Sequence, residues 1–295
     1  MFQIQCVMLK SLLLVLCAGI LLIACSEQKN NPESTSEVNY PKGKLFIIGG
    51  GDRGDSLMMD LIQASGWKPG DLITAITLPS GWGDSAYIWL NNDFKKLTGQ
   101  NCVKFDSAAV GVPAKLDSLR KSKIIFISGG DQAVMMRKIA GTDIKAAINE
   151  AYQNGALISG TSAGASIMSE RMITGDGLVD TAYEATFDNI WKGNLELVEG
   201  LGLLDSVIID QHFVVRSRYN RLLCAVIENK GFQCVGIDEG TAILVSQGKA
   251  TVIGASQVIE IGQPVSTDMT QDTLMAAKQI HLSIYLPGES FPIKQ

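Results

Sequence analysis

The chain has 295 residues, of which 46% are hydrophobic, and a formal net charge of −5 at pH 7. This acidic excess excludes the basic surface that nucleic-acid binding requires, so we expect no nucleic-acid partner. Only two histidines are present and the six cysteines show no metal spacing, so the composition does not indicate a zinc site.

The N-terminal pattern predicts a secretion signal. Lys10 precedes an apolar stretch, residues 12–24, which is short for a membrane span. The stretch ends in Leu-Ile-Ala-Cys, which resembles a bacterial lipobox, in which the signal is cut before a cysteine that then receives lipid. We therefore expect a signal peptide over residues 1–24, a lipidated Cys25 with a flexible tether over residues 25–42, and a folded domain over residues 43–295. This predicts a membrane anchor at the bacterial cell envelope; ordinary signal cleavage and an uncut anchor are the alternatives.

The folded part suits one domain of roughly 250 residues, which is enough to bury a core. Its cysteines are Cys102, Cys224 and Cys234. An odd number does not favour a disulfide framework, although one pair could close in an oxidising compartment.

Short apolar runs alternate with helical patterns along this domain. The runs that predict strands cover residues 45–51, 72–80, 123–131, 156–160, 207–213 and 233–240, and residues 242–256 predict a β-hairpin. Helical patterns cover residues 56–66, 85–99, 132–140, 143–155, 163–170 and 218–231. Apolar strands separated by helices predict an α/β fold, with a mostly parallel sheet covered by helices on both faces. Function then collects beyond the carboxyl ends of the strands, at residues 49–53, 129–132, 162, 210–212 and 238–239.

Gly49, Gly51 and Gly54 form the pattern G-x-G-x-x-G after the first strand. A dinucleotide site also needs an acid at the end of the next strand, but that strand ends in Leu-Pro-Ser, and no Walker lysine is present. We therefore interpret these glycines as allowing a close turn, and we expect no nucleotide cofactor.

Residues 160–164 read Gly-Thr-Ser-Ala-Gly at a predicted strand-to-helix junction, which is the pattern of a nucleophile elbow. Small residues allow a turn tight enough to expose the hydroxyl of Ser162 above the sheet. Gly129 and Gly130 end the neighbouring strand, and their backbone N–H groups suit an oxyanion hole beside the N–H of Ala163. A simple turn with Asp131 as a helix N-cap is compatible with that arrangement.

A serine nucleophile needs a base, and the two histidines are His212 and His281. His212 ends a buried strand on the functional edge, whereas His281 lies in an alternating stretch near the C-terminus, so we favour His212. The acid that orients it is left open by spacing, because Asp210, Asp238 and Glu239 all lie at this edge.

Arginines follow His212 closely in the sequence. Arg216, Arg218 and Arg221 could grip a carboxylate in a bidentate way. A solvated start of a helix is the alternative, although arginine there is not helped by the helix dipole.

Together these motifs resemble the cyanophycinase branch of peptidase family S51, serine exopeptidases related to dipeptidase E. The matching pieces occur in family order over nearly all of residues 43–260: SGGDQ (128–132), GTSAGAS (160–166), GLGLL, IIDQHF and R-x-R-x-x-RL (within 200–222), and GIDEGTA (236–242). The resemblance implies a fold like that of class I glutamine amidotransferases, with serine in place of their cysteine. It implies hydrolysis of cyanophycin, a polyaspartate carrying arginines, to β-Asp-Arg, without metal or cofactor, by an enzyme that forms a homodimer.

The resemblance also assigns residues. It implies Ser162 as nucleophile, His212 as base and Glu239 as the third member of the triad, with Gly130, Asp131 and Ala163 around the oxyanion hole. It implies a substrate pocket made by Gln132, Asp210, Gln211, Arg216, Arg218 and Arg221, in which Asp210 would meet a substrate guanidinium and the arginines its carboxylates.

Two positions depart from the family pattern, which has glutamine before the first arginine and glycine after it. Here they are Val215 and Ser217, which leaves the triad intact and puts the exact substrate in question. The alternatives are a dipeptidase for N-terminal Asp-X peptides and a non-catalytic lipoprotein that binds peptides. We expect residues 171–200 to form a loop or cover near the site.

Overall fold

The computed structural model describes residues 39–182, 186–269 and 273–295. The expected signal peptide, the lipidation site at Cys25 and most of the tether lie outside the described residues, so these remain predictions. None of the described helices is long and apolar enough to cross a membrane.

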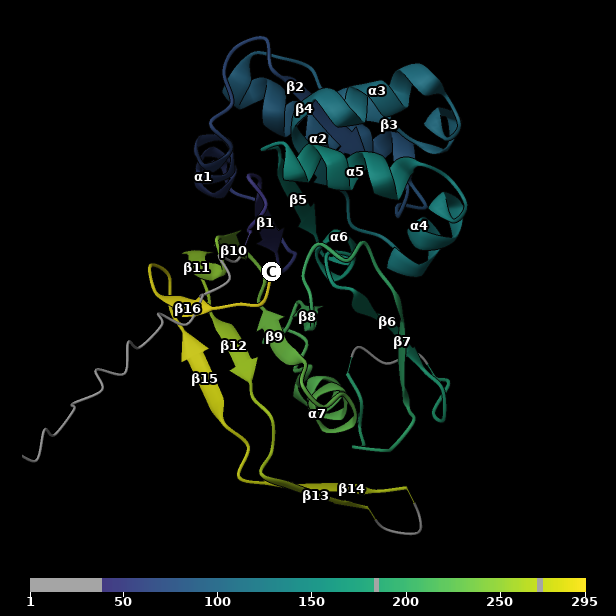
Figure 1. Cartoon of the computed structure of the whole chain (residues 1–295), viewed down its shortest axis with the longest axis vertical. Coiled ribbons are helices and arrows are strands. Elements are labelled where there is room, and N and C mark those ends of the chain that lie inside the picture. The colour runs from purple at the N-terminus through teal and green to yellow at the C-terminus, as the bar shows by residue number, and fades with distance from the viewer. Residues whose placement is uncertain (1–38, 183–185, 270–272) are drawn as a thin grey trace, which may run out of the picture. The chain divides into compact units, whose positions relative to one another are not determined.

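An eight-stranded sheet forms the centre of the domain (Figure 1). Its strands, in spatial order, are β16 (Ser290–Pro292), β11 (Lys249–Gly254), β10 (Thr241–Ser246), β1 (Lys44–Ile48), β5 (Leu157–Thr161), β4 (Ser122–Ile127), β2 (Leu72–Ile76) and β3 (Val103–Phe105). Five neighbouring strands, β1, β5, β4, β2 and β3, run parallel to one another. The sheet is extended beyond β1 by three antiparallel strands, β10, β11 and β16. This confirms the α/β class and the expected hairpin, which is β10–β11.

Helices cover both faces of the sheet, because successive side chains of a strand point to opposite sides. Phe46 and Ile48 of β1 pack with α1 (Asp55–Ser65) and α2 (Gly83–Thr98). Leu45 and Ile47 face the other layer, whose helices are α3 (Pro113–Lys121), α4 (Gln132–Ile139) and α5 (Ile144–Gln153). Two shorter helical turns are η1 (Ser107–Ala109) and α6 (Ala163–Ser166). The continuous apolar runs in the strands therefore reflect burial on two faces.

A second, four-stranded sheet has the order β15 (Leu282–Tyr285), β12 (Val258–Ile261), β9 (Gln233–Ile237) and β8 (Val207–Gln211). The sequence predicts β8 and β9 within the single parallel sheet. They are parallel to each other, but β9 pairs on its other side with β12 and not with a strand of the large sheet. Helix α7 (Tyr219–Glu228) connects β8 to β9 and packs on β9 and β12 (Figure 1). The two sheets meet where β9 leads into β10, because the N–H of Gly49 donates to the carbonyl of Thr241, and the N–H of His212 to that of Gly49.

Two further strand pairs lie outside both sheets: β6 (Arg171–Gly177) with β7 (Leu195–Glu199), and β13 (Ser266–Met269) with β14 (Met275–Lys278). The first pair occupies much of the segment expected to be a loop or cover. It is attached to the start of α4, since Nε2 of Gln132 donates to the carbonyls of Ile173 and Thr174, at 2.7 and 2.6 Å.

The packing of the central sheet predicts which side chains contribute most to the free energy of unfolding. Phe126 of β4 is fully buried and its ring packs edge-on against Phe94, with 5.9 Å between ring centroids. Phe126→Ala should therefore lower the free energy of unfolding by about 3–5 kcal/mol. Ile284→Ala, at a position that is 52% exposed, should change it by less than about 0.5 kcal/mol. Urea unfolding of both variants measures the difference, and equal losses would contradict this account of the core.

Candidate active site

Ser162 stands on a turn that only small residues permit. It follows β5 directly, and its backbone has φ 54° and ψ −116°, a conformation that side-chain-bearing residues rarely adopt. A Cβ on Gly160 would lie 2.2 Å from the carbonyl oxygen of Gly164, and one on Gly164 would lie 2.4 Å from that of Ile127. The chain thus folds back on itself and onto β4 at once. The helix that follows is four residues, Ala163–Ser166, shorter than the expected 163–170.

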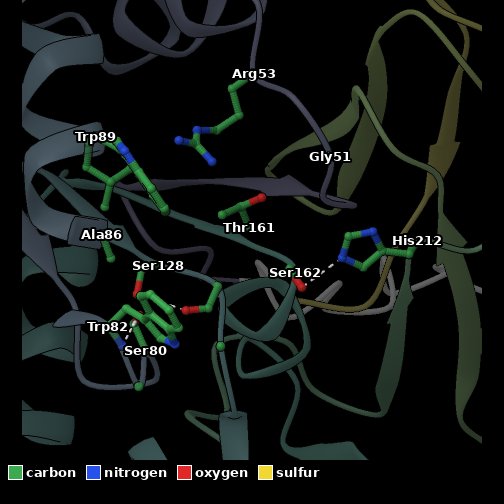
Figure 2. Close-up of a pocket in the computed structure, with 14 residues that line it drawn as sticks. Gly51, Arg53, Ser80, Trp82, Ala86, Trp89, Ser128, Thr161, Ser162 and His212 are labelled. Atoms are coloured by element: carbon green, nitrogen blue, oxygen red, sulfur yellow. Dashed lines mark hydrogen bonds between the residues drawn. The ribbon is translucent and has the colours of Figure 1, made fainter. Parts of the chain in front are cut away.

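His212 reaches Ser162 from the second sheet. Its Nε2 lies 2.9 Å from Oγ of Ser162, and its Nδ1 lies 2.5 Å from Oε1 of Glu239 (Figure 2). His212 also has a positive φ, 49°, and its N–H donates to the carbonyl of Gly49 at 2.7 Å. The alternative base, His281, is exposed and contacts the hydroxyl of Ser283.

The structure separates the three acids that sequence spacing left open. Glu239 contacts the His212 ring. Asp238 instead accepts the N–H groups of Val214 and Val215, each at 3.0 Å, and thereby holds the turn after His212. The third acid, Asp210, is buried against arginines. Of the three acids, Glu239 is therefore the one placed to complete a serine–histidine–acid chain of hydrogen bonds.

The glycine-rich loop after β1 makes room for this chain of contacts. A Cβ on Gly50 would lie 2.3 Å from the His212 ring, and one on Gly51 would lie 2.8 Å from Cβ of Glu239; both glycines have positive φ. A Cβ on Gly54, in contrast, would meet nothing within 4 Å. The pattern that superficially matches a nucleotide motif thus serves close packing of backbone against His212 and Glu239.

The loop after β4 borders Ser162 on its other side. A Cβ on Gly129 would lie 3.4 Å from Cβ of Ser162, and Gly130 has φ 138°. The N–H of Asp131, expected beside the oxyanion hole, donates to the carbonyl of Pro79 at 2.9 Å, and its carboxylate caps α4 through Val134 at 2.9 Å. Asp131 therefore acts as the N-cap, and its N–H is already bonded. Within the described residues, the N–H groups of Gly130 and Ala163 have no acceptor.

A cavity of about 550 Å³ opens directly beside Ser162. Ser162 and His212 form one end of it, and the loops after β1, β2 and β4 form its walls (Figure 2). Its other lining residues are Gly51, Arg53, Ser80, Gly81, Trp82, Ala86, Trp89, Leu90, Ser128, Gly129, Gly130 and Thr161. A substrate group that enters this space reaches the serine hydroxyl and the histidine nitrogen together.

Comparison with known proteins fits this geometry. The sequence profile of peptidase family S51 matches residues 95–253, more than half of the chain. The chain belongs to peptidase family S51. The cyanophycinase of Trichormus variabilis is 32% identical over 186 residues, which span 60% of this chain and 59% of that protein. The cyanophycinase of Synechococcus elongatus is 28% identical over 235 residues, or 77% of this chain and 70% of that protein.

Solved structures show the same fold at low sequence identity. A peptidase from an acI-B1 actinobacterium superposes with a TM-score of 0.62 at 18% identity, covering 85% of this chain and 97% of that one. A protein assigned as peptidase E from Listeria monocytogenes gives a TM-score of 0.54 at 19% identity, covering 72% of this chain and 99% of that one.

The residues that the S51 resemblance places in a substrate pocket are mostly buried and bonded to one another. Nε and Nη2 of Arg221 both donate to the carboxylate of Asp210, and Arg218 donates from Nη1 to the side chain and carbonyl of Gln211, both at 2.9 Å. Asp210 is fully buried, and Gln132 is buried against β6. Arg216 is half-buried. None of these six side chains lines the cavity beside Ser162, so their contact with substrate stays a prediction.

His212 is electrostatically suited to accept a proton in this S51 site. Burial lowers the pKa of its imidazole below the ordinary 6.5; the hydrogen bond to Glu239 raises it, and the charges of Arg216 and Arg218 lower it further. The net direction is downward, so the ring is neutral at neutral pH and Nε2 is free to take the serine proton.

The described residues show neither a cluster of metal-ligating side chains nor a reactive thiol. No group of three or more His, Cys, Asp or Glu side chains there is arranged to hold a metal ion. Cys102, Cys224 and Cys234 are buried and unpaired, and burial raises the pKa of Cys102 and of Cys224 to about 12. Such thiols stay protonated and unreactive.

The glycine loop gives a first prediction for this site. Gly50→Ala should displace the His212 ring and lower both stability, by about 1–3 kcal/mol, and catalytic rate, because its backbone is strained and its Cβ overlaps the ring. Gly54→Ala, in the same motif, should change neither. Thermal unfolding and turnover of the pair check this, and a silent Gly50→Ala would contradict the packing described.

The position of the His212 pKa gives a second prediction. With two histidines in the sequence, ring signals followed by NMR should show one that titrates below pH 6.5, assigned by its persistence in His281→Gln. Arg216→Gln should raise this midpoint, since the guanidinium charge disfavours the imidazolium. A midpoint that falls or stays fixed would contradict the assigned cause.

Proposed function

We propose that this protein is a serine peptidase that hydrolyses cyanophycin or related β-aspartyl peptides. The observation that carries the proposal is the continuous contact from Oγ of Ser162 to Nε2 of His212 at 2.9 Å, and from Nδ1 of His212 to Glu239 at 2.5 Å. Ser162 and His212 both have a positive φ, 54° and 49°, and strained backbone of this kind is typical of functional sites.

The proposed reaction begins with attack of the Ser162 oxygen on the carbonyl carbon of the scissile bond, while Nε2 of His212 takes the hydroxyl proton. The resulting oxyanion accepts hydrogen bonds from the N–H groups of Gly130 and Ala163. His212 then gives the proton to the leaving nitrogen, the C–N bond breaks, and an acyl-enzyme remains. A water that loses its proton to His212 hydrolyses this ester. Glu239 keeps the imidazole oriented and stabilises its cationic form.

The substrate class rests on the relatives and on charge. Both aligned relatives carry the name cyanophycinase. Asp210 lies against Arg218 and Arg221 beside the histidine turn, and Arg216 acts by its charge on His212. The family resemblance assigns these charges to a substrate that bears carboxylates and guanidinium groups. A dipeptidase for Asp-X peptides is the second candidate, because the departures at Val215 and Ser217 leave the exact substrate open.

We also propose that the enzyme is held at the cell envelope by lipid on Cys25, as its N-terminal sequence predicts. It would then meet polymer or peptide from outside the cytoplasm. The homodimer expected from the family stays a prediction.

The proposal predicts that the purified protein releases β-Asp-Arg from cyanophycin, detected by mass analysis. Ser162→Ala and His212→Ala should lower the rate by about 10⁴-fold or more without loss of folding. His281→Ala is the matched control and should retain full activity, since that ring is remote from Ser162. Turnover retained in Ser162→Ala would remove the mechanism.

Other substrates distinguish the alternatives. Cleavage of Asp-X dipeptides without release from cyanophycin would identify the dipeptidase. Tight binding of either substrate with no turnover, and no covalent labelling of Ser162 by a serine-directed reagent, would identify a peptide-binding lipoprotein.

A further inference from the structure

The wall of the cavity that faces away from His212 has a chemistry that the triad does not use. Trp82, just before α2, and Trp89, within it, both line the cavity, and their side chains are 77% and 62% exposed. Figure 2 shows them on the opposite side of the cavity from His212, with Ser162 between. Exposed aromatic side chains gathered at a concave site are typical of ligand binding, because only a ligand removes them from water.

A cation, Arg53, lines the same cavity as these two indoles. Arg53 extends from the loop after β1 into the cavity, and Nη2 donates to Asp93 at 2.9 Å (Figure 2). That pair engages one of its three nitrogens, and its Nε is buried without an acceptor in the described structure. The hydroxyl of Thr161, the residue before Ser162, is likewise buried without a partner and lines the same cavity. Unsatisfied buried polar atoms carry a cost, which a bound polar group that draws them into hydrogen bonds would offset.

The aromatic wall is fixed relative to Ser162 by the backbone. The carbonyl of Pro79 accepts the N–H of Asp131, and a Cβ on Gly130 would lie 2.3 Å from that same oxygen. The N–H of Trp82 donates to the hydroxyl of Ser80 at 3.0 Å. The loop that carries Trp82 is therefore attached to the loop that borders the nucleophile, so a group held on the indoles has a defined distance from Ser162.

We infer that this wall is a subsite for a substrate residue with a large apolar or aromatic side chain and a free α-carboxylate, which Arg53 binds. This rests on the proposed peptidase function and refines its substrate class. Flat apolar groups gain most from burial against two indoles, and a carboxylate matches a guanidinium. A substrate arginine in the same place would bring its charge beside Arg53. Within the proposed function, the structure thus favours the Asp-X candidate, with peptides that end in an apolar residue.

Three dipeptides with an ordinary α-peptide bond test the subsite on the whole protein: Asp-Phe, Asp-Ala and Asp-Phe carboxamide. Wild type should prefer phenylalanine to alanine, and free acid to amide, each by at least about tenfold in kcat/KM. Trp89→Ala should remove the first preference, and Arg53→Met the second, each leaving the other in place. Ile88→Ala is the control, because Ile88 is 54% exposed on the same helix but does not line the cavity.

Binding separates failure of the subsite from failure of the proposed function. Quenching of tryptophan fluorescence by Asp-Phe in Ser162→Ala should be lost on adding Trp89→Ala and kept on adding Ile88→Ala. Turnover with selectivity unchanged in Trp89→Ala and Arg53→Met overturns the subsite and leaves the peptidase. Trp89-dependent binding, with no turnover of these dipeptides or of cyanophycin by wild type, supports the subsite and overturns the peptidase. Absence of both binding and turnover of these dipeptides overturns the subsite, and the cyanophycin assay then decides the peptidase.

Discussion

The site depends on one constraint: the ring of His212 must fit between the backbone of Gly50 and the side chains of Ser162 and Glu239. Ser162 belongs to the end of β5 in the large sheet, whereas His212 and Glu239 follow β8 and β9 in the smaller one. The three groups meet because the N–H of His212 bonds to Gly49 and the N–H of Gly240 bonds to Gly50. Because Gly50 and Gly51 have no side chains, His212 and Glu239 of the smaller sheet can approach Ser162 of the large sheet closely enough to form these contacts. The positive φ of both Ser162 and His212 is the local cost of that meeting.

Much of this was predictable from sequence, for a definite reason. The carboxyl ends of parallel strands must lie at one edge, so the apolar runs over residues 45–51, 123–131 and 156–160 already predict that Ser162 and the glycine-rich loops lie together. The hydrophobic periodicity and the length of the apolar runs could not predict which strands pair with one another. β8 and β9 have the same apolar character as β1 and β5, and nothing in their composition says that they form a separate sheet in which β9 pairs with β12. For the same reason spacing left three acids open, since the choice of Glu239 depends on how Asp238 bonds to Val214 and Val215 across the turn.

The glycine motif and the cavity wall show two further limits of sequence patterns. Gly51 belongs to a nucleotide pattern and Gly50 lies within it, yet both are required by His212 and Glu239, more than 150 residues later in the chain. Trp89 lies within a segment whose periodicity predicts an ordinary amphipathic helix, and Trp82 lies just before it. The exposure of both side chains becomes informative only when the cavity beside them is known. A signal was present in the form of two tryptophans, out of four in the chain, within eight residues.

The two sides of the site would contribute to substrate binding in different ways. On the side of α7, Asp210 and Arg221 satisfy each other in full burial, so an incoming charge there must compete with an existing bidentate pair, and the net gain is small. Arg216, half-buried, acts on the site through its charge, which adds to the effect of burial in lowering the pKa of His212. On the side of α2, indole faces and a partly engaged guanidinium meet solvent, and burying them releases free energy at little competing cost. Selectivity within a common triad would then vary most readily through the loop after β2, since changing Trp82 or Trp89 leaves every contact of Ser162, His212 and Glu239 untouched.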